Sequence, residues 1–166
     1  MSRESNSPVR PIHIRAADTS DIPAILALAN SVTSAAHWPA QIYAEMFSAN
    51  APARLILIAE NEQKKLHGFA VARFTADECE LENIVVRPES QRCGIGRKLL
   101  AALLESARAK GATRMFLEVR ESNRAARALY EKCEFTESGR RADYYSSPKE
   151  DALIYQISLS PASATL

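Results

Sequence analysis

The stretch from Asn83 to Leu104 restricts what this chain can fold into more than any other part of the sequence. It begins with an apolar, β-branched run, Ile84–Val86, which is typical of a strand. A loop with two glycines and several cations follows at Gln91–Lys98. Beyond the loop, leucine and alanine recur at helical spacing from Leu99 to Ala107, which predicts an amphipathic helix. The sequence therefore predicts a strand that passes through a glycine loop directly into a helix.

The glycine loop has the chemistry of an anion site. Gly94 and Gly96 allow the backbone to lie flat and to present its N–H groups outward. The first turn of a helix has free N–H groups, and the helix dipole adds positive potential there. Four cations stand near the loop against one carboxylate, a local charge of +3; these residues are Arg87, Arg92, Arg97, Lys98 and Glu89. The stretch therefore predicts a site for a phosphate-bearing ligand.

Spacing restricts which phosphate ligand this loop can bind. A nucleoside-triphosphate loop requires G-x-x-x-x-G-K-S/T, which this stretch does not contain. A dinucleotide loop requires a third glycine where this chain has Leu99. Gly-x-Gly alone also occurs in ordinary strand-to-helix turns. The fuller pattern Gln91-Arg92-x-Gly94-x-Gly96 is more specific, and it resembles the coenzyme A diphosphate loop of the GNAT superfamily of acyltransferases.

Composition sets outer limits on structure and function. A chain of 166 residues that is 46% hydrophobic and 25% charged predicts a single globular domain with one substantial core. A net charge of +1 gives no general electrostatic case for binding nucleic acid or a membrane. The cysteines, Cys79, Cys93 and Cys133, are odd in number and lack metal-ligand spacing, so we expect no metal site and a reducing, cytoplasmic location.

The order of expected elements is strand, two helices, three strands, helix, strand, helix and two strands, which is a mixed α/β domain over residues 12–159. Residues 1–11 are expected to form a disordered tail and residues 160–166 a flexible one. Thr19 or Ser20 is expected to cap the first helix. The last two strands are expected over 135–141 and 152–159, with a connection between them. Trp38, in the first interhelical loop, either contacts substrate or packs over the edge of the core.

A second informative segment runs from Leu117 to Phe135. Glu118 lies in an apolar strand, where a buried carboxylate is costly unless an arginine pairs with it or chemistry uses it. Tyr130 falls on the apolar side of a short helix, where a tyrosine is usually part of the core. Asn123 reads equally as the cap of that helix. Each residue alone is therefore more typical of structure than of a site.

Taken together, the segment resembles the RimI-type ribosomal-protein-alanine N-acetyltransferases, a branch of the GNAT superfamily. That branch reads L-E-V-R-x-S-N-x-x-A-x-x-L-Y-E-x-x-G-F. The matching residues are Leu117, Glu118, Val119, Arg120, Ser122, Asn123, Ala126, Leu129, Tyr130, Glu131 and Phe135. Asn83-Ile84-x-Val86 upstream and Arg141-x-x-Tyr144-Tyr145 downstream extend the likeness. The chain departs from the pattern at Glu134, where the family has glycine, and at Glu82, where an apolar residue is usual.

The resemblance implies the GNAT fold, a mostly antiparallel mixed sheet whose central strands splay apart. It implies direct transfer of acetyl from acetyl-CoA to a protein N-terminal amine, with N-terminal alanine of a small-subunit ribosomal protein as the family's acceptor. Glu118 matches the general base and Tyr130 the general acid. The residues that match the coenzyme A site are Ile84, Val85, Val86, Gln91, Arg92, Cys93, Gly94, Ile95, Gly96, Arg97, Asn123 and Tyr130.

Other interpretations stay open at this point. The same fold could acetylate a lysine or a small-molecule amine, with Glu80 or Glu82 on the preceding strand as the base. A catalytically silent acyl-CoA sensor is a further alternative, against which the presence of both Glu118 and Tyr130 argues. The sequence leaves both a monomer and a homodimer possible.

Overall fold

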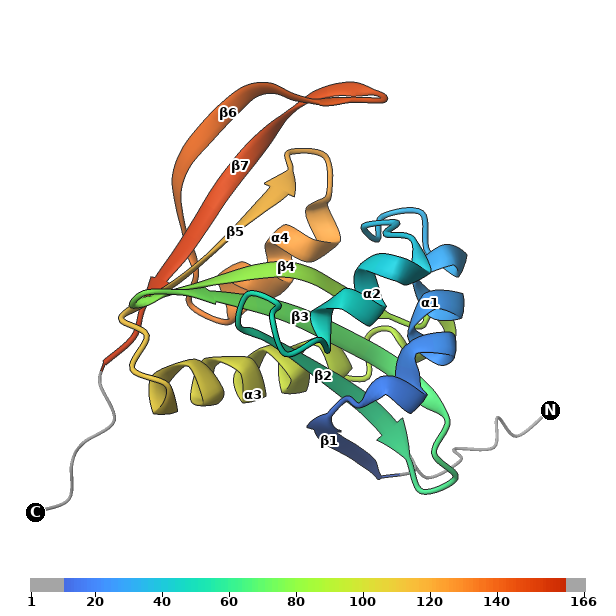
Figure 1. Cartoon of the computed structure of the whole chain (residues 1–166). Helices are drawn as coiled ribbons and strands as arrows, with labels where there is room; N and C mark the ends of the chain where they lie inside the picture. Colours follow the sequence, from blue (N-terminus) through green and yellow to red (C-terminus); the bar gives the residue numbers. More distant parts are fainter. Residues whose placement is uncertain (1–10, 161–166) are drawn as a thin grey trace, which may run out of the picture.

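The computed structural model describes residues 11–160, so the expected tails fall almost entirely outside the described residues. Figure 1 shows a curved sheet with helices on both of its faces. In chain order the elements are β1 (Ile12–Ala16), a 3-10 turn η1 (Thr19–Asp21), α1 (Ile22–Ser31), α2 (Ala40–Met46), β2 (Arg54–Asn61), β3 (Leu66–Thr75), β4 (Glu78–Val86), a 3-10 turn η2 (Pro88–Ser90), α3 (Ile95–Ala109), β5 (Arg114–Arg120), α4 (Arg124–Lys132), β6 (Thr136–Ser146) and β7 (Lys149–Ser158). The predicted order of elements is confirmed.

The seven strands form one mixed sheet in the order β1-β2-β3-β4-β5-β7-β6. Only β4 and β5 pair in parallel, because the chain between them crosses over through α3. All other neighbours pair antiparallel. This is the mostly antiparallel GNAT architecture expected from the resemblance.

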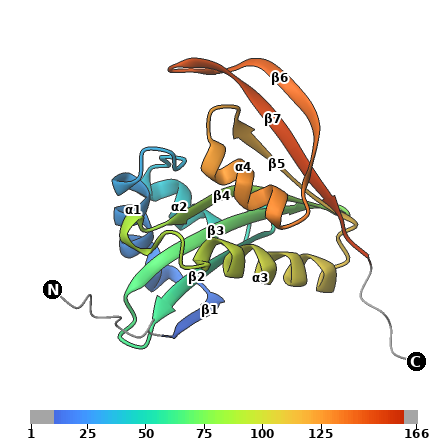
Figure 2. The same cartoon turned by 180° about the vertical axis from the view of Figure 1, so that it is seen from behind.

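Two apolar clusters cover the two faces of the sheet. On one face α3 and α4 pack over residues of β2–β5 and β7; Leu99 and Leu103 of α3 and Met115 of β5 are fully buried there. On the other face α1 and α2 pack over β2, β3 and the end of β4. Figure 2, seen from behind, shows α3 and α4 lying across the first of these faces. The second cluster contains no residue of β5 or β7, so the helices leave that part of the second face uncovered.

The structure differs from the prediction at two places. Asp18, not Thr19 or Ser20, is the capping residue: its side chain accepts from the Ser20 N–H, and η1 precedes α1. The last two strands run on into a long hairpin with a tight turn at Ser147–Pro148, which rises away from the body of the domain. Polar residues at 142–151 suggested a loop, but cross-strand pairing overrides that local preference.

Within residues 11–160, no helix is long and apolar enough to span a membrane. The same residues hold no cluster of three or more histidine, cysteine, aspartate or glutamate side chains suited to a metal ion.

Candidate active site

The site is organised by a strand gap between β4 and β5. The two strands pair at only four positions, from Glu78 opposite Arg114 to Leu81 opposite Leu117. Beyond that point, residues 82–86 of β4 and 118–120 of β5 have no partner in each other. We call this unpaired stretch the strand gap. It confirms the predicted splay of the central strands.

A β-bulge at Glu82 lies where the strand gap begins. Val71 of β3 faces Asn83 while the next residue, Ala72, faces Leu81, so Glu82 is the extra residue of β4. A bulge bends its strand and shifts the alternation of side chains between faces. Accordingly Leu81 packs under α3, whereas Val85 packs under α1 and α2.

Alternation along β4 decides which backbone groups face the strand gap. The N–H of Arg87 donates to the carbonyl of His67 on β3 at 2.8 Å. Since an antiparallel strand directs every second residue to the same neighbour, Val85 also pairs with β3. Ile84 and Val86 then present their backbone groups to the strand gap. Val85, predicted as a third contact, is instead directed to β3.

The glycine loop presents a row of free backbone donors. Arg92 and Gly94 adopt left-handed conformations with φ of +63° and +78°. Within the described residues, the N–H groups from Arg92 to Arg97 have no acceptor; the next, of Lys98, closes the first helical bond to the Gly94 carbonyl at 3.0 Å. Six consecutive donors at the positive end of a 15-residue helix form an anion cradle. An arrangement of this kind can accept a negatively charged group.

The side chains of the loop have separate tasks. Arg92, Cys93 and Arg97 are exposed, while Ile95 is buried in the core and anchors the loop. The Gln91 side chain donates to the Val86 carbonyl at 3.3 Å and so ties the loop to the end of β4. Gly96 serves packing.

A Cβ at Gly96 would lie 3.1 Å from a Leu129 methyl group, so glycine here lets α4 approach α3 closely. Arg87 is directed away from the loop, because it donates to the Leu66 carbonyl at 2.9 Å and pairs with Glu89 at 3.6 Å.

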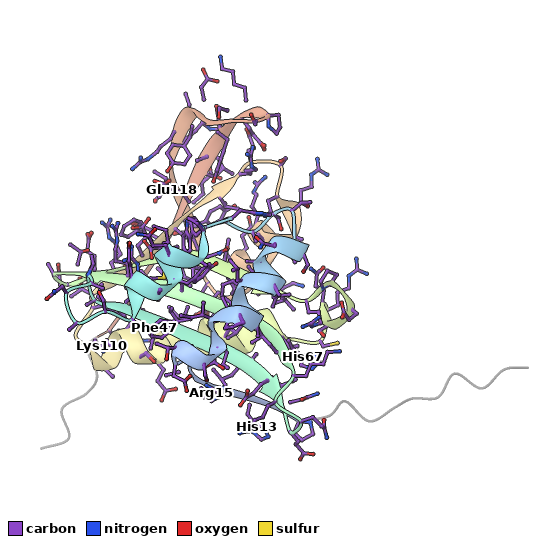
Figure 3. The ribbon with its side chains drawn as sticks, turned by 45° about the vertical axis from the view of Figure 1, so that its right-hand side comes forward. His13, Arg15, Phe47, His67, Lys110 and Glu118 are labelled. Carbon is purple, nitrogen blue, oxygen red and sulfur yellow. The ribbon has the colours of Figure 1, made fainter. Side chains whose placement is uncertain are left out.

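Glu118 lies on the uncovered part of the sheet. Its neighbours Leu117 and Val119 point into the core under α3, so the carboxylate points to the opposite face. Its side chain is 16% exposed and pairs with the guanidinium of Arg141 on β6 at 2.9 Å. Figure 3 shows it between the hairpin and the body of the domain. Glu118 therefore has the arginine partner that the sequence offered as one explanation. This ion pair is also compatible with a role of Glu118 in the chemistry.

Tyr130 lies on the other face, in the core cluster under α3 and α4. Its ring centroid is 5.9 Å from that of Phe135 and 6.1 Å from that of Tyr155. Burial raises the pKa of its hydroxyl well above that of a free phenol. The hydroxyl therefore stays protonated at neutral pH. Glu118 and Tyr130 thus lie on opposite faces of the sheet.

The two remaining ambiguous residues have structural roles in the described chain. The Asn123 carboxamide oxygen accepts from the Ala126 N–H at 3.2 Å, so Asn123 caps α4. Trp38 is half-buried and packs on Tyr43, with ring centroids 5.7 Å apart. Neither contact prevents the remaining surface of these side chains from meeting a ligand.

The rival carboxylates on β4 are held by arginines from the neighbouring strands. Glu82 pairs with Arg54 at 2.7 Å and with Arg73 at 3.7 Å. Glu80 pairs with Arg73 at 2.5 Å. The side chain of Arg54 is only 18% exposed, whereas that of Arg141, the partner of Glu118, is 56% exposed. The arginine paired with Glu118 is therefore more exposed to solvent than Arg54, and it can be displaced from its carboxylate more easily.

Sequence reasoning assigned no site role to the hairpin, and the structure brings it to Glu118. Besides Arg141, Tyr144 lies near the Glu118 carboxylate, whose proximity raises the pKa of that tyrosine. Tyr144 is 50% exposed, the one large apolar side chain so exposed among the described residues. Its ring packs edge-on against Tyr145, which in turn lies under the guanidinium of Arg120 at 4.0 Å. In the sequence, the motif Arg141-x-x-Tyr144-Tyr145 was the signal that could have pointed to this contact.

Comparison with known proteins covers these same elements. Residues 22–135 match the profile described as the acetyltransferase (GNAT) family. Over 116 residues the chain is 38% identical to the ribosomal protein bS18-alanine N-acetyltransferase of Escherichia coli strain K12. The aligned region covers 69% of this chain and 78% of that protein. The corresponding protein of Salmonella typhimurium strain LT2 is 37% identical over the same shares. The crystal structure of the ribosomal-protein-S18-alanine N-acetyltransferase from Escherichia coli has a TM-score of 0.79 at 32% identity, covering 94% of this chain and 99% of that chain.

Proposed function

The chain belongs to the acetyltransferase (GNAT) family, and from this premise we propose that it acetylates the N-terminal α-amine of a protein, with acetyl-CoA as donor. We further propose that the acceptor is a ribosomal protein that begins with alanine, and that the reaction takes place in the cytoplasm. The named relatives at 37–38% identity support this choice of acceptor class. The observation that carries the proposal is the strand gap, with an anion cradle at one end and a carboxylate beside it.

The residues present fit the donor that this family uses. The six free N–H groups from Arg92 to Arg97 would hold the diphosphate, and the Arg92 and Arg97 side chains would add positive charge. The backbone of Ile84 and Val86 would hydrogen-bond the pantetheine arm along the strand gap, and the free amide hydrogens of Asn123 would reach it from α4. When bound, acetyl-CoA supplies an acetyl thioester, which is activated toward attack by an amine.

Glu118 is the proposed general base. An α-amine with a pKa near ~7.8 is about one-tenth neutral at pH 7, so one carboxylate has only a modest task. A lysine near ~10.4 would be neutral in well under a thousandth of molecules. The arriving ammonium would replace the exposed Arg141 as the partner of Glu118, and then give up a proton to the carboxylate or to a water held by it.

Tyr130 would donate a hydrogen bond to the sulfur of the leaving thiolate. The raised pKa of its buried hydroxyl makes complete proton transfer to a thiolate of pKa about 8.5 more unfavourable than for a free phenol. A hydrogen bond that strengthens as charge develops on sulfur needs no such transfer. The amide of Ile84, which faces the strand gap, would donate to the acetyl oxygen as it gains charge.

The acceptor is tested by a thiol-release assay with acetyl-CoA. Peptides beginning Ala-Arg, Ser and Met are compared with an N-terminally blocked peptide that contains an internal lysine, and with a polyamine. We expect the Ala-Arg peptide to give the highest kcat/KM. Turnover of the polyamine or the internal lysine without turnover of any free N-terminus would contradict the proposal.

Cysteine labelling tests the donor site without requiring turnover. Cys93 is exposed in the loop, Cys133 is half-buried, and Cys79 is buried with its pKa raised to about 12. Treatment with iodoacetamide, read by peptide mass spectrometry, is therefore expected to modify Cys93 first and Cys79 last. Saturating CoA should slow the modification of Cys93 and leave the rate at Cys133 unchanged. Equal rates at Cys93 with and without CoA would place the donor elsewhere.

A further inference from the structure

A hydrogen-bonded pair, the half-buried His67 and the buried Ser90, lies beside the glycine loop and takes no part in the chemistry described above. His67 is the second residue of β3, and Ser90 ends η2, one residue before Gln91. The two side chains meet at 2.7 Å, between Nδ1 of the imidazole and Oγ of the serine. Ser90 is only 7% exposed. Figure 3 shows His67 at the end of the sheet where the loop before α3 lies.

The residue pair joins the loop to the sheet through two kinds of bond. The His67 carbonyl accepts from the Arg87 N–H at 2.8 Å, and its side chain reaches Ser90, three residues further on. The Ser90 N–H closes η2 by donating to the Arg87 carbonyl at 2.8 Å. The turn from Arg87 to Ser90 is therefore fixed to β3 at both of its ends, and the free donors begin two residues later, at Arg92.

The surroundings of His67 favour the neutral imidazole over the charged form. Its second nitrogen, Nε2, is buried and has no hydrogen-bond partner among the described residues. Burial, and then the charges of Lys65 in the β2–β3 turn and Arg87 at the end of β4, lower the pKa of His67, against a weaker opposite effect of Glu89 in η2. A buried nitrogen without a hydrogen-bond partner lowers the stability of the folded protein, so an apolar side chain would suit this position better if it only had to pack. The hydrogen bond that its other nitrogen, Nδ1, makes to Ser90 gives a reason for a histidine here.

We infer that His67 is a positioning residue for the donor loop: its hydrogen bond to Ser90 sets the direction in which the free N–H groups of Arg92–Arg97 point. This inference rests on the proposed function, since it assumes that the loop binds the diphosphate of the donor. It assigns to His67 no contact with the donor itself. Loss of the bond should therefore weaken donor binding while leaving acceptor binding and the chemical step intact.

The test compares variants of both partners. His67→Leu and Ser90→Ala each remove the bond, and His67→Asn keeps an amide nitrogen near the position of Nδ1. We expect the first two to raise the Kd for CoA, measured by calorimetry, by about 3- to 10-fold, the effect of one hydrogen bond. The KM for acetyl-CoA should rise in parallel, with kcat and the acceptor KM within twofold of the wild type. His67→Asn should restore most of the affinity, and the double variant should be no worse than either single one.

Thr113→Val is the matched control. The Thr113 hydroxyl donates to the Asp77 carboxylate at 3.0 Å, and this bond also ties together two loops, far along the chain from the donor loop. Its removal should leave the Kd for CoA unchanged. If His67→Leu and Ser90→Ala lower the melting temperature but bind CoA like the wild type, the inference is wrong. If the wild type itself does not bind CoA, the proposed function fails, and that outcome is distinct.

Discussion

Replacing Glu118 with glutamine is expected to lower kcat by about 10²- to 10⁴-fold at pH 7, the usual contribution of a general base. Glutamine keeps the volume of the side chain and can still accept a hydrogen bond from Arg141, so the fold should be retained. The deficit should shrink as the pH rises from 7 to 9. Over that range an α-amine of pKa ~7.8 goes from about one-tenth to almost fully neutral, and no longer needs the carboxylate. A pH series of kcat for wild type and variant measures this directly.

Two further variants separate the base from its neighbours. Glu82→Gln removes a carboxylate of the same size on the facing strand, held by Arg54, and should change kcat only a few-fold. Tyr130→Phe should lower kcat without recovery at high pH, because the hydroxyl is proposed to serve the leaving sulfur and not the amine. A large effect of Glu82→Gln beside a trivial effect of Glu118→Gln would move the base to β4.

Gly94→Asp is expected to abolish donor binding. The side chain would add a negative charge amid the free N–H groups of the loop, next to the expected diphosphate. Two like charges about 4 Å apart at an effective dielectric of about 20 repel by roughly 4 kcal/mol, which corresponds to about a thousandfold in affinity. Space is not the obstacle, because a Cβ at Gly94 meets no atom within 4 Å. Calorimetry with CoA gives the affinity, and circular dichroism reports whether the fold survives.

Gly111→Asp is the matched control for this change. Gly111 has φ of +83°, close to the +78° of Gly94, and a Cβ there also meets no atom within 4 Å. Both substitutions therefore impose a similar backbone strain of about 1–2 kcal/mol. Gly111 follows the opposite, negative end of α3, away from the loop. CoA affinity that falls equally in both variants would mean that strain, not charge, causes the loss.

Local sequence patterns were sufficient for most of the fold. The apolar period along α3 predicted the face that is buried, because Leu99, Leu103 and Ala107 all reach the core. The paired glycines predicted the sharp turn and the free helix N-terminus, since a left-handed residue and a helix N-terminus are local properties of the backbone. Glu118, alone among apolar neighbours on its strand, was correctly singled out as a carboxylate needing a partner.

Long-range pairing limited the rest. The partner of Glu118 lies 23 positions away on β6, a number set by the hairpin register, which no local pattern encodes. The bulge at Glu82 likewise depends on how β4 aligns with β3. The same alignment pairs the backbone of Val85 with β3, away from the strand gap. The hydrogen bond between His67 and Ser90 joins residues 23 positions apart through the same pairing of strands.

The brief parallel pairing of β4 with β5 divides the sheet into two antiparallel halves, β1–β4 and β5–β7–β6, hydrogen-bonded along only four residue pairs. A pantetheine arm bonded to Ile84 and Val86 would occupy the position of the absent rungs. On this proposal the donor would be part of the architecture as well as a reactant: at 100 times its Kd it would stabilise the folded domain by about 2.7 kcal/mol. Release of CoA at the end of each catalytic cycle would therefore also remove the hydrogen bonds that its pantetheine arm had made to β4.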